Sequence, residues 1–340
     1  MTALTETGRA APLRAPRRLD AHVHLVGNGS SGSGCEIAGR GMEQWLAPFM
    51  LHSLGLPVRT LRGDLDNAYR ERLLELVRAS SLDAVVLFAQ DKVYRDDGTV
   101  WTDRCTFHVP NDYVLQLARA HPEFLPAVSI HPGRPDAIEE LERCLAGGAV
   151  ALKLLPNCHN VDCALPRYRR FWERMAVAGL PFIAHTGSEF TVAETRPDLA
   201  HPHNLRVPLE CGVKVIAAHC ATGLIGSQRD WFWTWVAMLP RYPNLYGDLS
   251  ALSLIGRDRW LPVCLRPDIL PRVLHGSDLP VPVHGWPSWL RGRIGWAGYL
   301  ALRRESNPLE RACRLMSLLG FPAETFIAAE KVLRLPAGPA

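Results

Sequence analysis

Short apolar runs alternate with amphipathic stretches along most of the chain. Residues 82–89 are almost entirely apolar with valines at their centre, which is typical of a strand buried on both faces of a parallel sheet. The preceding stretch, 69–79, repeats apolar residues at helical spacing. Seven further runs have the character of strands: 18–25, 124–130, 150–155, 181–184, 213–218, 245–249 and 273–275. The pattern therefore predicts eight strands.

Amphipathic segments separate these runs and predict the helices 112–120, 136–146, 168–178, 204–211, 231–239 and 257–265. Gly148, Gly179 and Gly212 stand just before strands, where a glycine ends the preceding helix. Eightfold strand–helix alternation predicts a (β/α)₈ TIM barrel over residues 18–285. An open doubly wound sheet is the alternative, but no glycine-rich phosphate loop of the dinucleotide type follows the first strand.

Two segments exceed what a barrel needs. The long first connection, 27–67, is rich in glycine and serine and is expected to lie over the active face, with freedom to move. Residues 286–340 form a C-terminal helical extension with helices at 308–319 and 323–333. Residues 1–17 have no apolar core of a secretory signal, so we expect a disordered lead-in.

Composition limits the classes of binding partner and the cellular location that we expect. The net charge is +4 and the arginines are scattered, so nucleic acid binding is not expected. No apolar stretch is long enough to span a membrane. Nine irregularly spaced cysteines favour free thiols in a reducing cytoplasm over a disulfide framework. We expect a cytoplasmic protein that binds a small-molecule substrate, and leave homo-oligomer formation open.

Polar residues end or follow most of the predicted strands, where barrel enzymes place reactive groups. They are His22 and His24, Gln90 and Asp91, His131, Lys153, His185, His219, Asp248 and Asp278. The His22-Val23-His24 pair projects two imidazoles to one side of a strand, because side chains alternate with period two. Two imidazoles on one face suit a divalent ion such as zinc. A single buried histidine is usually a core residue, whereas this combination predicts a metal site.

Four motifs resemble those of a known superfamily. Asp20-Ala21-His22-Val23-His24, Ile183-Ala184-His185-Thr186-Gly187, Ala217-Ala218-His219-Cys220 and His275-Gly276-Ser277-Asp278 are similar to the metal-site motifs of the amidohydrolase superfamily. The resemblance is strongest to the amidohydrolase-2 branch, which also holds non-oxidative decarboxylases. It covers residues 18–285, essentially the whole barrel.

The resemblance implies that His22, His24 and His185 bind the metal. Asp278 would touch the metal and act as general base. His219 would either bind a second metal or polarise the substrate and donate a proton. Lys153 would either be carboxylated and bridge two ions or remain unmodified. The implied cofactor is one or two divalent ions, zinc first, with manganese or iron as alternatives.

The implied reaction is hydrolysis of an amide, ester or lactone bond in a small molecule by metal-activated water. Non-oxidative decarboxylation of an aromatic or unsaturated acid is the alternative, and a catalytically inactive barrel that binds a partner is a third possibility. His131, Asn157 and Glu189 are candidate substrate contacts from the strand ends. Asp248 either contacts substrate or orients a ligand histidine.

Overall fold

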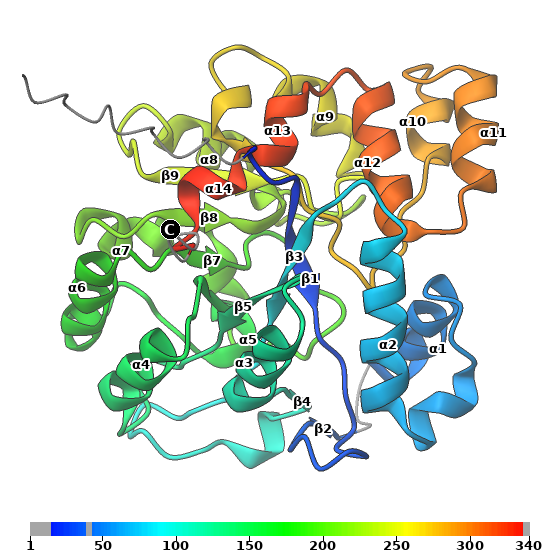
Figure 1. Cartoon of the computed structure of the whole chain (residues 1–340). Helices are drawn as coiled ribbons and strands as arrows, with labels where there is room; N and C mark the ends of the chain where they lie inside the picture. The colour runs from blue at the N-terminus through cyan, green and yellow to red at the C-terminus, as the bar shows by residue number, and fades with distance from the viewer. Residues whose placement is uncertain (1–14, 39–42, 336–340) are drawn as a thin grey trace, which may run out of the picture.

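Eight parallel strands form a barrel (Figure 1). The computed structural model describes residues 15–38 and 43–335. Neighbouring strands pair in chain order, and the last joins the first through hydrogen bonds from Ala21 N to His275 O (2.9 Å) and from His24 N to Leu279 O (2.8 Å). The predicted (β/α)₈ barrel is therefore confirmed. Its strands are β1 (Leu19–His24), β3 (Ala84–Phe88), β5 (Phe124–Val128), β6 (Ala151–Leu154), β7 (Phe182–Ala184), β8 (Val215–Ala217), β9 (Leu245–Asp248) and β10 (Val273–Leu274).

Helices occupy most of the predicted intervals and cover the outside of the barrel (Figure 1). The α-helices of the barrel are α2 (Leu65–Arg78), α3 (Asn111–Ala120), α4 (Ala137–Ala146), α5 (Pro156–His159), α6 (Arg169–Ala178), α7 (Arg206–Glu210), α8 (Phe232–Met238) and α9 (Leu261–Cys264). Short 3₁₀ helices lie at 58–62, 102–104, 166–168, 197–200, 202–205, 218–221, 258–260 and 270–272. Gly148, Gly179 and Gly212 have positive φ angles, as predicted for residues that end helices.

Both faces of the barrel strands are buried. One face packs in the barrel interior and the other packs against the surrounding helices. Inward side chains such as Val86, Ala127 and Ile216 fill the barrel, whereas Val85, Leu152 and Val215 face the helices. On β1 the pairing register shifts between Asp20 and Val23. This irregularity changes the alternation of the strand, so that Ala21 belongs to the barrel interior while Val23 belongs to the outer core.

The first connection is anchored by one carboxylate. It contains β2 (Glu36–Ile37), which pairs antiparallel with β4 (Phe107–His108), and α1 (Glu43–Ser53). The Asp66 carboxylate accepts hydrogen bonds from the backbone of residues 28, 29 and 31 and from the hydroxyls of Ser31 and Ser33. Because Asp66 is buried in the first turn of α2, it fixes the glycine- and serine-rich segment to this helix. These hydrogen bonds hold residues 28–33 to the start of α2, and the mobility of the connection stays a prediction.

The C-terminal extension returns to the start of the barrel. Its helices are α10 (Trp286–Leu290), α11 (Trp296–Arg304), α12 (Pro308–Leu318), α13 (Ala323–Ile327) and α14 (Ala329–Val332). The single helix predicted at 323–333 is two short ones that are separated at Ala328. In the first of them, Thr325 O accepts a hydrogen bond from His275 N on the barrel (3.2 Å). Ala329, Val332 and Leu333 join the interior core at the N-terminal ends of the strands.

The structure also bears on the expectations for the N-terminal segment, the cysteines and membrane-spanning segments. Residues 1–14 of the predicted lead-in lie outside the described residues, while Arg17 forms an ion pair with Glu330 (3.2 Å). The nine cysteines all fall in the described ranges and none is in a disulfide. Of the helices in those ranges, none is both long and apolar enough to cross a membrane.

Candidate metal centre

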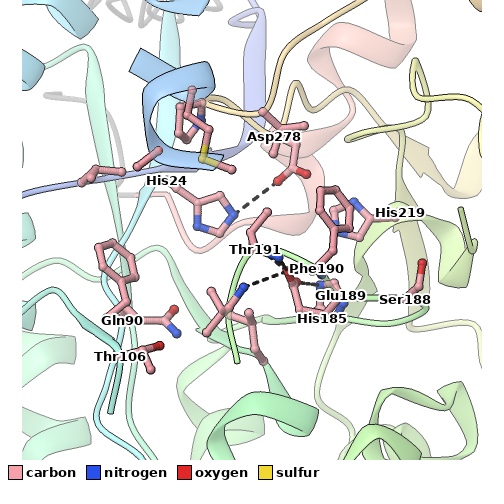
Figure 2. Close-up of a pocket in the computed structure, with 18 of the residues that line it drawn as sticks. His24, Gln90, Thr106, His185, Ser188, Glu189, Phe190, Thr191, His219 and Asp278 are labelled. Atoms are coloured by element: carbon pink, nitrogen blue, oxygen red, sulfur yellow. Dashed lines mark hydrogen bonds and ion pairs between the residues drawn. The ribbon is translucent and has the colours of Figure 1, made fainter. Parts of the chain in front are cut away.

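A buried cluster of histidine, lysine and aspartate lies at the C-terminal ends of the strands. His22 Nε2 is 3.2 Å from Asp278 Oδ1 and 3.2 Å from Lys153 Nζ. The same Asp278 oxygen is 3.3 Å from His24 Nε2 (Figure 2). The side chains come from β1, from β6 and from the turn after β10. The structure thus brings together residues separated by more than half of the sequence.

The donor set fits a divalent cation. Ligand atoms of His22, His219 and Asp278 all lie within 4.8 Å of one another, the one such group found among the described residues. His185 Nε2 is buried without a hydrogen-bond partner, although buried polar atoms are nearly always satisfied. Imidazole nitrogens with a carboxylate oxygen suit zinc and similar ions. A bound cation would give this nitrogen a partner.

Three histidines are oriented in the same way. His22 Nδ1 lies 2.9 Å from Asp248 Oδ2, His219 Nδ1 lies 3.0 Å from Ser250 O, and His185 Nδ1 lies 3.3 Å from Glu189 Oε2. Because the oxygens beside His22 and His219 accept, Nδ1 of these two rings carries a proton, and in the neutral ring Nε2 then has the lone pair. Oxygen partners of this kind are the usual outer support of metal-binding histidines.

Asp248 and Glu189 therefore hold the candidate ligand histidines in position. The second oxygen of Asp248 accepts from the backbone N–H of His219 (2.9 Å), so one carboxylate contacts the imidazole of His22 and the backbone of His219. Glu189 uses its other oxygen to accept from Phe190 N (2.8 Å) and Thr191 Oγ1 (2.6 Å). These bonds hold the loop after β7 against His185 (Figure 2).

Burial and mutual charge set the protonation states. Burial raises the pKa of Asp278, but the neighbouring histidines His219 and His22 outweigh it, so the net pKa lies well below the ordinary value and the carboxyl is ionised. Burial lowers the pKa of His185 to about 3 and holds that of His219 well below its ordinary value, so both imidazoles are neutral. Burial also lowers the pKa of Lys153 to about 8. Neutral imidazoles and an ionised carboxyl are the forms that bind metals.

Two of these residues have unusual backbone conformations. His219 has φ 59° and Asp278 has φ 68°, in the left-handed region that side chains other than glycine rarely adopt. Such conformations cost about 1–3 kcal/mol each and cluster at functional sites. Asp278 N donates to His22 O (2.9 Å), which ties the turn to β1. The backbone is therefore strained where it delivers the two side chains to the cluster.

A pocket opens above the cluster (Figure 2). His24, His185, Glu189, His219 and Asp278 lie on its wall, with Gln90 and Thr106 nearby. His22 and Lys153 are buried beneath it. The remaining wall is mainly apolar and comes from several loops: Val26, Ile37, Ala47, Met50, Phe107, Leu155, Phe190, Val192, Pro280 and Val281.

Three predicted substrate contacts lie outside this pocket lining. His131 Nε2 bonds His159 O (3.0 Å), Asn157 Nδ2 donates to Glu194 (2.8 Å), and Asp248 lies under the two histidines that it orients. They follow strand ends as expected, but their side chains are used in holding loops and imidazoles. Of the two alternatives for Asp248, the geometry matches the orienting role.

Sequence reasoning missed Arg257 and the two strands that cover the pocket. Arg257 falls at the predicted start of a helix, yet its side chain is 1% exposed and lines the pocket. Ile37 and Phe107, on β2 and β4, form part of the apolar wall. The one available signal was an arginine that directly follows Leu254-Ile255-Gly256, shortly after the seventh strand.

Comparisons with known proteins agree with the fold. A TIM-barrel protein of uncharacterised function from Bordetella bronchiseptica superposes with a TM-score of 0.60 at 17% identity, covering 93% of this chain and 95% of that one. 5-Carboxyvanillate decarboxylase from Sphingomonas paucimobilis superposes with a TM-score of 0.56 at 12% identity, covering 95% and 100%. No curated protein matches the sequence. The amidohydrolase family model matches residues 19–294, and the chain therefore belongs to the amidohydrolase family.

Proposed function

We propose that the protein is a metal-dependent hydrolase that cleaves an ester, lactone or amide bond of a small molecule. The observation that carries the proposal is the position of Asp278. Its ionised carboxylate touches His22 and His24, belongs to the cluster with His219, and faces an apolar pocket. A carboxylate held beside imidazole lone pairs can serve as both metal ligand and base.

His22, His24, His185 and Asp278 would hold the ion, with zinc the first candidate. When bound, such an ion lowers the pKa of water towards neutrality and polarises the bond to be cleaved. The Asp278 carboxylate would take the proton from water and deliver it to the leaving group. The apolar wall of the pocket limits access of bulk water, which strengthens these charge interactions.

His219 has a narrower role in this scheme than the sequence alone allowed. Its Nδ1–H is used by Ser250 O, so Nε2 carries a lone pair and cannot donate while the ring is neutral. The geometry therefore favours His219 as a further ligand over His219 as a neutral proton donor. Lys153, next to His22 Nε2, is the residue on which the number of ions depends.

The direct test combines metal analysis with a substrate panel. Purified protein loaded with zinc, manganese or iron would be assayed against aryl esters, lactones and anilides, with Asp278→Asn as the control. Hydrolysis that requires both the ion and Asp278 is the expected result. Release of carbon dioxide from aromatic or unsaturated acids without hydrolysis would instead identify a decarboxylase. Failure to bind any of the ions would leave the barrel as a binding protein.

The ion count needs its own measurement. Anomalous scattering from crystals grown with zinc would show one or two ions. Density at Lys153 would show whether its amine is carboxylated. We expect two ions together with a carboxylated lysine, or one ion with a free amine.

A further inference from the structure

Arg257 is a buried cation in the wall of the proposed substrate pocket. Its side chain is 1% exposed, and Nη2 donates to Ser188 O (2.6 Å). Its Nε is buried without a hydrogen-bond partner. Among the described residues no carboxylate forms an ion pair with it, whereas the adjacent Asp258 pairs with Arg291 (2.5 Å) and Arg293 (3.5 Å).

This arrangement is costly without a ligand. Buried charges in proteins are normally paired, and an unmet buried donor loses the hydrogen bonds that water would provide. Burial lowers the pKa of Arg257, while the negative charges of Asp278 and Glu189 act in the opposite direction. A guanidinium nevertheless stays protonated in proteins. The pocket therefore holds a permanent positive charge with hydrogen-bonding capacity to spare.

The surroundings of Arg257 define what could satisfy it. Apart from the metal cluster, the pocket wall is mostly apolar, with Phe107, Phe190, Val192 and Met50 among its side chains. A planar guanidinium matches a carboxylate in geometry and charge. An apolar body with a carboxylate at one end would fill the wall and pair with Arg257.

We infer that Arg257 anchors a carboxylate of the substrate that is distinct from the bond being cleaved, so that the substrates are apolar or aryl carboxylates. This inference rests on the proposed function for its reacting bond. It also requires that anion binding at Arg257 be measurable without turnover. Arg257 would then act as a specificity-determining residue.

Equilibrium binding of benzoate to the zinc-loaded protein tests the inference, with benzamide as the uncharged analogue. The variants are Arg257→Gln and Arg257→Lys, with Arg293→Gln as the matched control, because Arg293 is outside the pocket lining. Zinc content and thermal unfolding are measured on every variant. Calorimetry gives the dissociation constants, so the outcome does not depend on finding a hydrolytic substrate.

We expect benzoate to bind the wild type at least about tenfold more tightly than benzamide, the size of one charged hydrogen bond. Arg257→Gln should weaken benzoate about 10- to 100-fold with unchanged zinc content, Arg257→Lys should recover part of the loss, and Arg293→Gln should match the wild type. Should Arg257→Gln fail to fold, weakened benzoate binding in Arg257→Lys with benzamide unaffected supports the same conclusion. Absence of benzoate binding, equal affinity in wild type and Arg257→Gln, or a loss that parallels loss of zinc would each overturn the inference.

Discussion

The two ends of the barrel interior differ in polarity: one is apolar and the other holds buried polar side chains. At the N-terminal ends of the strands, Ala329 and Val332 of α14 join an interior core with residues such as Leu19 and Ile216. At the C-terminal ends the same interior continues into His22, Lys153 and Asp278, which are buried but polar. In Figure 1, α14 (red) lies at the opposite end of the barrel from β2 and β4.

The difference separates stability from chemistry. Apolar burial stabilises the first end by about 25 cal/mol per Å² removed from water. The second end buries charges and holds His219 and Asp278 at left-handed φ angles, both of which oppose folding. Substitutions at the polar end should therefore change activity or metal affinity, and substitutions at the apolar end should change the free energy of unfolding. Four experiments test this difference.

The largest effect is expected from Asp278→Asn. The change keeps the shape of the side chain and removes the base and a charged metal ligand, so kcat/KM for the hydrolysed substrate should fall by about 10²–10⁴-fold. Steady-state kinetics on zinc-saturated protein measure the loss, and denaturant unfolding checks the fold. Activity within threefold of the wild type would remove Asp278 from the reaction.

Asp248→Asn should have the next largest effect, on metal affinity. The amide cannot replace both acceptor contacts, to His22 Nδ1 and to the His219 backbone N–H, so the zinc dissociation constant should rise about 10- to 100-fold. Competition with a chelator measures it. Asp66→Asn, at a buried carboxylate in the first connection, is the control and should leave zinc affinity unaltered. Equal shifts in both variants would mean that Asp248 acts on the fold and not on the histidines.

Val332→Ala tests the apolar end. Removing two methyl groups from a 1% exposed side chain should lower the free energy of unfolding by about 2 kcal/mol and leave zinc affinity unchanged. Urea denaturation measures the first quantity and chelator competition the second. Val177→Ala, at an 83% exposed position on α6, should change stability by less than about 0.5 kcal/mol. If Val332→Ala weakens zinc binding, the two ends are coupled.

The fourth experiment concerns the pH dependence of stability. Burial lowers the pKa of His275 to about 3, from an ordinary value of 6.5. Between these values the unfolded chain binds the proton and the folded protein does not, so the free energy of unfolding falls as pH is lowered below about 6.5. His131 and His159, with pKa values lowered by burial to about 4 and about 3, act in the same direction.

His275→Phe should remove one of these contributions. Between pH 6 and 4 its stability should fall less steeply than that of the wild type, by about 1.4 kcal/mol per pH unit. The ring packs beside Phe326, so an aromatic replacement keeps the contact. Urea denaturation at several pH values gives both slopes. Parallel slopes would show that His275 is already protonated in the folded protein.

The sequence predicted the barrel because its evidence is local. Each strand is an apolar run and each helix a periodic one, and the parallel order follows from their alternation. The contact of α13 with the barrel was not predictable, because the hydrogen bond from His275 N to Thr325 O joins residues 50 positions apart in the sequence. The anchoring of the glycine-rich first connection by Asp66 was hidden for the same reason.

In the candidate site, too, local features were predictable from the sequence and contacts between distant segments were not. Strand-end positions brought His24, His185, Glu189, His219 and Asp278 to one pocket, as the barrel geometry implies. Which nitrogen each histidine presents, and that Asp248 lies beneath two of them, depends on contacts between different strands. Arg257 gave no such signal, since only the folded loop carries it into the pocket wall.

The position of α14 also has a consequence for synthesis in the cell. β1 contacts α14, a helix that follows it much later in the sequence. On the order of 300 residues are made between them, which at 5–20 residues per second takes roughly 15–60 seconds. During that interval the nascent barrel has an uncovered apolar end. This end of the barrel interior can therefore be covered only after α14 has been synthesised, and chaperones have that interval in which to act.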